Sequence, residues 1–123
     1  VKLTSASVRI VSDNVAAIVG KPDIAVDCMD NAEGRRTLQA YCGAAGIPLL
    51  HSAVSAGGDF GLVQWSPEFV PDEAAAGAPT CENGNALPFL MLTSAVAAGS
   101  VQKFLASGQK NSWIITPAGV KKI

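Results

Sequence analysis

Charged residues are scarce in this chain. They make up 15% of its 123 residues, against about a quarter in a typical domain, and the nine Lys and Arg are scattered. A protein that follows a phosphate backbone needs a basic stripe, so the composition argues against nucleic acid as a partner. Apolar residues reach 49%, which excludes a disordered chain. Much of this apolar surface must be buried in the fold or covered by a partner.

Metal-ligating and redox side chains are few as well. The chain has three cysteines, Cys28, Cys42 and Cys81, no Cys-x-x-Cys pair, and a single histidine, His51. A structural zinc site needs four such ligands at close spacing, so no zinc is expected. An odd number of widely separated cysteines suits a reducing compartment, and we expect a cytoplasmic protein.

No apolar run predicts a membrane span. The longest run, residues 86–98, is interrupted by Pro88, Thr93 and Ser94, whereas a span needs about 20 apolar residues. We therefore expect a core helix in this region and no membrane partner. The large side chains expected to pack in the core from this helix are Phe89, Met91, Leu92 and Phe104.

Apolar periodicity predicts one α/β domain over residues 1–123, with a long loop at 66–86. The expected elements are strand 8–11, helix 14–19, strand 24–29, helix 32–45, strands 47–54 and 60–65, helix 87–107, and strands 113–116 and 120–123. Strand–helix–strand with short links makes parallel neighbours, and the tight turn at 57–59 adds an antiparallel strand. We expect a three-layer, Rossmann-like domain with a mixed, mostly parallel sheet and an antiparallel addition.

The stretch Asp-Cys-Met-Asp-Asn at 27–31 is the most informative part of the chain. It places two carboxylates and an amide at the carboxyl end of an expected strand, where open α/β sheets bind ligands. The helix that follows favours anions at its N-terminus. Two interpretations remain open. The carboxylates could hold a metal–phosphate group, or Asp30 or Asn31 could simply cap the helix, with Glu33 completing a capping box.

Other polar residues have plain structural interpretations. Asp27 is expected inside a strand, where a buried acid must be paired. The pattern favours a solvated helix face for Arg35 and Arg36. His51 follows a buried strand position and is expected to be a satisfied histidine of the core or of a pocket edge.

The cysteines divide into two kinds. Cys28 and Cys42 lie among apolar residues and are expected to be inert. Cys81 lies in the polar loop just before a helix, which leaves a reactive role open, although the neighbouring Glu82 works against thiolate formation.

Three blocks of this sequence resemble the second half of the ThiF/MoeB/HesA adenylyltransferases, which are relatives of the ubiquitin-activating enzymes. They are Asp23-Ile-Ala-Val-Asp-Cys-Met-Asp-Asn31 with Arg35, Gly46-Ile-Pro-Leu-Leu-His-Ser-Ala-Val-Ser55 continuing to Val63, and Thr80-Cys-Glu-Asn-Gly84 before the small-residue helix. All three occur in the family's order and at about its separations, over residues 8–107.

The resemblance implies ATP-dependent adenylation of the C-terminal carboxylate of a ubiquitin-like or sulfur-carrier protein, followed by transfer to a thiol or sulfide. It implies that Asp30 helps to hold Mg²⁺ and the ATP phosphates, with Asn31 and Arg35 beside that site. Mg²⁺ prefers hard oxygen ligands, which agrees with this assignment. Cys81 would lie where some members keep a thiol that receives the activated carrier.

The sequence also departs from the family. It lacks the glycine-rich loop, the ribose-binding acid, the ATP-binding Arg and Lys, and the zinc-binding Cys-x-x-Cys pairs. Because basic groups neutralise the triphosphate, we expect adenylation only when an N-terminal half or a complementary subunit completes the site, and a homodimer is the other expected assembly. The alternative is a non-catalytic interaction module that dimerises without nucleotide. Half of a dehydrogenase is the least favoured interpretation, since the glycine fingerprint is missing.

Overall fold

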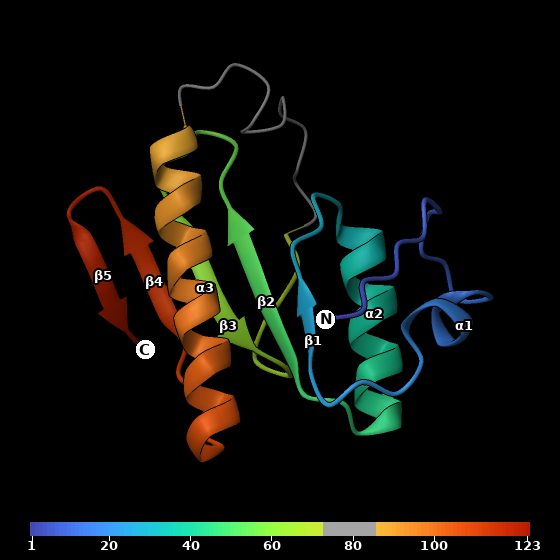
Figure 1. The fold of residues 1–123 in the computed structure, drawn as a ribbon. Coiled ribbons are helices and arrows are strands. Elements are labelled where there is room, and N and C mark those ends of the chain that lie inside the picture. The colour runs from blue at the N-terminus through green and yellow to red at the C-terminus, as the bar shows by residue number, and fades with distance from the viewer. Residues whose placement is uncertain (73–85) are drawn as a thin grey trace.

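A five-stranded sheet forms the centre of the fold, with helices on both faces (Figure 1). The computed structural model describes residues 1–72 and 86–123. The strands are β1 (Ala25–Asp27), β2 (Leu49–Val54), β3 (Gly61–Trp65), β4 (Trp113–Thr116) and β5 (Gly119–Lys122), and they lie in the order β1-β2-β3-β4-β5. The helices are α1 (Val15–Val19), α2 (Ala32–Ala45) and α3 (Leu87–Ser107).

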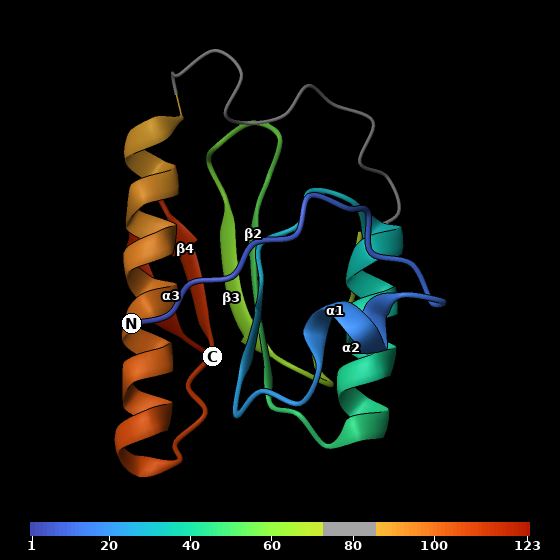
Figure 2. The same ribbon diagram turned by 45° about the vertical axis from the view of Figure 1, so that its right-hand side comes forward.

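The sheet separates two apolar clusters, which gives the fold three layers. Helices α1 and α2 cover one face and α3 covers the other, as the turned view in Figure 2 shows. Successive strand residues point to opposite faces. Leu49 therefore packs toward α1 and α2 with Leu38 and Cys42, while Leu50 packs toward α3 with Ala97. β2 therefore has apolar residues on both of its faces.

The sheet is mixed, as expected. β1 and β2 are parallel, and the three pairs β2–β3, β3–β4 and β4–β5 are antiparallel. The parallel part is thus one strand pair, smaller than the sequence suggested, because β4 and β5 continue the antiparallel side as a hairpin. In the β1–β2 register, Asp27 lies opposite His51.

The predicted bounds of α2 and α3 are confirmed, and each helix ends at a glycine in the left-handed region, Gly46 or Gly108, both at φ 69°. The strand expected at 8–11 is wrong. Among residues 1–72 and 86–123 no strand pairs with this segment, and the Asn14 side chain folds it into a turn by accepting a hydrogen bond from the Val11 N–H and donating one to the Arg9 carbonyl.

Helix α3 buries only one side. Thr93, Ala97 and Ser100 are buried against the sheet. The expectation of core packing is confirmed for Phe89 and Phe104, which contact the cluster below α3. It is wrong for Met91 and Leu92, which are 72% and 40% exposed, because the sheet touches α3 from one side only.

α3 is long and apolar enough to cross a membrane by length and composition alone, a test that core helices also meet. Its apolar window has a mean hydropathy of 1.4 and is 17% buried. Its buried residues, Thr93, Ala97 and Ser100, are small or polar, and Phe89 and Phe104 flank them at the sheet, so α3 combines a close packing face with an uncovered apolar face.

Gly61 allows α3 to approach β3 closely. A Cβ at this position would lie 2.8 Å from Thr93 Oγ1 and 3.4 Å from Phe89 Cε1. We expect Gly61→Ala to lower the free energy of unfolding by about 1–3 kcal/mol, as overpacking does. Gly99, on the same helix, has nothing within 4 Å of a built Cβ, so Gly99→Ala should raise stability by about 0.5–1 kcal/mol. Urea unfolding of both variants measures the difference, and equal effects of the same sign would contradict the packing of α3.

Candidate functional site

In the loop between β1 and α2, one residue caps the helix and its neighbour presents an exposed carboxylate. Asn31 caps α2: its Oδ1 accepts a hydrogen bond from the Gly34 N–H at 2.7 Å. Glu33 forms no capping box, since its carboxylate is 2.6 Å from Arg9 Nη2 on the surface. Of the two capping candidates the sequence left open, the structure therefore selects Asn31. Asp30 is exposed and receives a hydrogen bond of 3.3 Å from the Asn31 amide.

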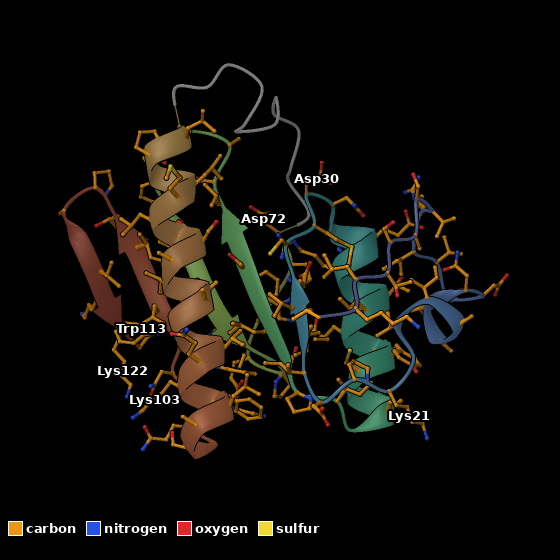
Figure 3. The ribbon with its side chains drawn as sticks, viewed as in Figure 1. Lys21, Asp30, Asp72, Lys103, Trp113 and Lys122 are labelled. Atoms are coloured by element: carbon orange, nitrogen blue, oxygen red, sulfur yellow. The ribbon has the colours of Figure 1, made fainter. Side chains whose placement is uncertain are left out.

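Asp30 lies at the carboxyl end of β1, next to the start of α2 (Figure 3). Mg²⁺ is usually held in phosphoryl-transfer sites by one or two carboxylates together with phosphate oxygens and water. One exposed carboxylate beside a helix N-terminus fits that requirement and would leave the other ligands to the nucleotide. Within residues 1–72 and 86–123, no three His, Cys, Asp or Glu side chains come together as an all-protein metal site.

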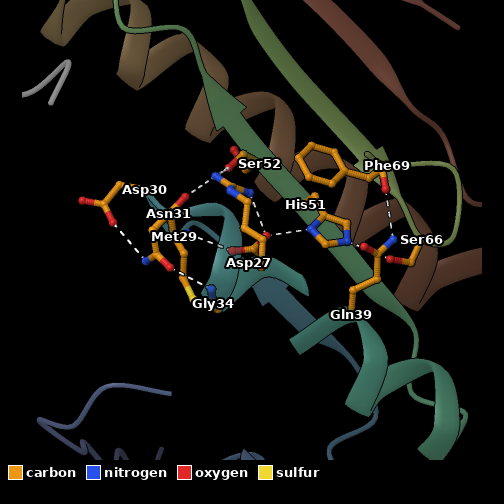
Figure 4. A network of polar contacts seen from close by, with 11 residues as sticks. Asp27, Met29, Asp30, Asn31, Gly34, Gln39, His51, Ser52, Ser66 and Phe69 are labelled. Carbon is orange, nitrogen blue, oxygen red and sulfur yellow. Dashed lines mark hydrogen bonds and ion pairs between the residues drawn. The ribbon is translucent and has the colours of Figure 1, made fainter. Parts of the chain in front are cut away.

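Below this loop, the Asp27 carboxylate is the centre of a buried polar network (Figure 4). Asp27 is 1% exposed. Its Oδ2 accepts a hydrogen bond from Arg35 Nη1 at 2.7 Å and lies 2.6 Å from His51 Nδ1. Its Oδ1 accepts the Met29 N–H at 2.8 Å. The expectation that a buried Asp27 is paired and bonds a nearby loop is confirmed.

Arg35 is buried, so the expected solvated face is wrong for this residue, while Arg36 is exposed. The Arg35 Nη2 donates to the Ser52 carbonyl at 3.1 Å and to the Met29 carbonyl. The burial follows from spacing, because residue 35 shares a helix face with the buried Leu38 and Cys42, three and seven residues further on. The same spacing, read in the sequence, signals a buried arginine.

His51 is a satisfied core histidine, as expected. Its Nε2 lies 2.7 Å from Ser66 Oγ, and the Phe69 ring stacks on it with centroids 4.2 Å apart. Arg35 Cζ lies 5.4 Å from the centroid of the same ring. The Gln39 amide donates to the Phe69 carbonyl at 3.0 Å and ties this segment to α2. Sequence reasoning missed Ser66 and Phe69, which lie in a segment without periodicity.

Asp27 contacts His51, and His51 contacts Ser66, in the order of the carboxylate, base and nucleophile of a catalytic triad. The surroundings favour a structural role. His51 is 0% exposed and covered by Phe69, and Arg35 shares the carboxylate. Two grooves on the described surface lie elsewhere, one between α3 and the β4–β5 hairpin and one beside α1 and α2. The chain of contacts joins β1, β2 and the segment after β3.

Of the residues that the resemblance singles out, Asp30 and Asn31 lie side by side on the loop. Arg35 is close in sequence, but its guanidinium points to protein groups below the loop. Cys81 lies outside the described residues. Cys28 is exposed rather than enclosed in an apolar setting, and Cys42 is buried.

Removing one member of the buried Asp27–Arg35 ion pair should destabilise the protein, because the other charge stays buried without its partner. Asp27→Asn removes the charge that compensates Arg35, and we expect the free energy of unfolding to fall by about 3–5 kcal/mol. Glu33→Gln is the matched control, because the Arg9–Glu33 pair has side chains 72% and 68% exposed and should contribute less than about 1 kcal/mol. Urea unfolding at pH 7 compares them. Similar losses in both variants would show that burial of the Asp27 pair does not matter.

The Cys28 thiol should react slowly although the residue is exposed. Partial burial raises the pKa of the Cys28 thiol above its ordinary value, the Asp27 carboxylate raises it further, and Arg35 lowers it in part. Because the thiolate is the reactive form, the pH profile of alkylation should be shifted upward in the folded protein. Iodoacetamide labelling of Cys28, followed by peptide mass spectrometry, tests this against the same protein in urea. Coincident profiles would rule out the shift.

The comparison with protein families agrees with the geometry. The ThiF family model matches residues 1–108 of the 123-residue chain, a range that includes β1, α2, β2, β3 and α3. No curated protein sequence matches the chain. The matched range contains both the Asp30 loop and the buried Asp27 network, and it extends slightly beyond the span 8–107 on which the resemblance was based. The chain therefore belongs to the ThiF family.

Proposed function

We propose that this chain forms the C-terminal part of a ThiF-like adenylating site. That site would use ATP and Mg²⁺ to activate the C-terminal carboxylate of a ubiquitin-like or sulfur-carrier protein. The observation that carries the proposal is that two neighbouring residues, Asp30 and Asn31, have different roles. Asn31 satisfies the start of α2, which leaves the exposed Asp30 carboxylate available to a ligand at the carboxyl end of β1.

The position of Asp30 suits a bound cation–phosphate group. Mg²⁺, when bound, would neutralise charge that develops on the phosphate oxygens during adenylation. On this chain, Asp30 would hold the cation, and the N-terminal amides of α2 would favour the phosphates electrostatically. The Asn31 amide orients the Asp30 carboxylate through its 3.3 Å hydrogen bond. Cys81 is proposed as the thiol that accepts the activated carrier.

The open edge of the sheet at β1 supports the idea that further residues complete the adenylating site. β1 is an edge strand, and it pairs with β2 in parallel. Parallel strands are normally covered on both faces. Val26 at the middle of β1 points to the α3 face and is 44% exposed, because α3 packs on β2 and β3. A further strand beside β1 would pair its open backbone edge. Since the Arg35 guanidinium is engaged by Asp27, the basic groups for the triphosphate would come with that added part.

A second candidate function, a non-catalytic interaction module, is favoured by the outer face of α3. Met91 and Leu105 on this face are 72% and 64% exposed. Next to it is a groove of about 360 Å³ between α3 and the β4–β5 hairpin, where Lys103 and Trp113 lie (Figure 3). Exposed apolar surface of this kind is typical of protein interfaces. Such a module would form a homodimer or heterodimer that does not depend on nucleotide.

Native mass spectrometry of the protein isolated from its own cells, with and without Mg²⁺·ATP, separates the two candidates. A nucleotide adduct on an assembly that contains a glycine-rich loop supports the adenylating site. A dimer that forms equally with and without Mg²⁺·ATP, and never takes up nucleotide, supports the interaction module.

Asp30→Asn tests the role of Asp30 in the isolated assembly. If the carboxylate holds Mg²⁺ on the phosphates, ATP–pyrophosphate exchange should fall about 100-fold or more. Asp23→Asn is the matched control, since Asp23 is also exposed but precedes β1 at the opposite end of the strand. It should leave the exchange rate unchanged. Normal exchange by Asp30→Asn would remove the central support for the proposal.

A further inference from the structure

We infer that Asp27 and Arg35 are positioning residues, which fix the loop at 28–31 and thereby hold the Asp30 carboxylate in place for its cation. The inference deepens the proposed function and rests on the role of Asp30 given there. It assigns Arg35 an action through the backbone of Met29, in place of direct contact with phosphate. The positioning role depends on how the backbone N–H and the backbone carbonyl of one residue, Met29, are held.

Both backbone groups of Met29 are held by the buried ion pair. The Met29 N–H donates to Asp27 Oδ1 at 2.8 Å, and the Met29 carbonyl accepts from Arg35 Nη2. The second carboxylate oxygen of Asp27, Oδ2, accepts a hydrogen bond from the second guanidinium nitrogen of Arg35, Nη1, at 2.7 Å. Asp27, Met29 and Arg35 thus close a ring of contacts, and Met29 cannot rotate without breaking at least one charge-assisted hydrogen bond.

The other side of Asp30 is fixed as well. Asn31 is held by its capping bond to the Gly34 N–H. Gly34 also lets the Met29 side chain lie against the first turn of α2, because a Cβ at position 34 would be 2.7 Å from Met29 Sδ. Asp30 therefore stands between two residues that are each held by side-chain hydrogen bonds, so its backbone has little freedom. A ligand group held in this way loses less entropy when it binds.

The surroundings of Arg35 explain why it acts indirectly. Its charge is compensated by Asp27, its Nη2 also donates to the Ser52 carbonyl at 3.1 Å, and the Phe69 ring lies beneath its guanidinium. Moving the guanidinium to a phosphate would leave a buried carboxylate without its partner, which is costly. His51 holds the same carboxylate from β2 and keeps it aimed at the loop.

Amide NMR of the ¹⁵N-labelled protein, with Mn²⁺ as the probe, tests the inference. The variants are Arg35→Met, Arg35→Lys and, as the matched control, Arg36→Met on the exposed neighbour in the same helix. In the parent protein and in Arg36→Met, Mn²⁺ should broaden the amide signals around residue 30. In Arg35→Met, hydrogen exchange of the Met29 amide should rise, and the Mn²⁺ concentration needed for broadening should increase, each about ten-fold, as expected for one lost charged hydrogen bond.

Arg35→Lys should fall between the parent and Arg35→Met, since an ammonium keeps the charge but cannot reach all three acceptors in the fork geometry of a guanidinium. This variant decides the question if Arg35→Met does not fold. A folded variant with parental Met29 exchange and parental Mn²⁺ broadening would overturn the inference. If the parent shows no broadening near residue 30, the cation role of Asp30 and the inference built on it both fail. If the parent binds Mn²⁺ but the Arg35 variants do not differ from it, only the positioning role fails.

Discussion

The buried Asp27 carboxylate is the constraint on which the rest of this structure depends. A carboxylate that is 1% exposed must be compensated, and four groups from different parts of the chain converge on it or on its partners. Arg35 comes from α2, His51 from β2, Met29 from the following loop, and Ser66 from the segment after β3, through His51. These contacts tie β1 to α2 and to β2, and they therefore hold the parallel strand pair β1–β2 together.

One stretch of five residues combines this stabilising role with the proposed chemistry. Asp27 points into the protein and is used by the fold, whereas Asp30 is exposed. Asn31 takes the capping role that would otherwise occupy Asp30. The segregation follows from geometry, because the strand ends at Asp27 and the loop then turns outward before α2 begins. The fold and the proposed ligand site therefore use different carboxylates of the same stretch.

Sequence patterns sufficed where local rules decide the outcome. The bounds of α2 and α3 follow from the helix stop at Gly46 and Gly108, and the antiparallel turn after β2 from glycine. The buried network did not follow, because its contacts join residues far apart, such as Asp27 and His51, which are 24 positions apart. No periodicity marks Ser66 or Phe69. The exposure of Met91 could not be predicted from the sequence either, because it depends on how much of α3 the sheet covers.

Part of the apolar surface of this chain, which has 49% apolar and 15% charged residues, stays uncovered. Val26 on β1 is one such residue, and Met91 and Leu105 on the outer face of α3 are others. β1 is at one end of the sheet, while α3 packs on β2 and β3 from the face opposite α2 (Figure 2). A strand added beside β1 would pair the open backbone edge of the sheet, whereas a partner on the outer face of α3 would cover Met91 and Leu105.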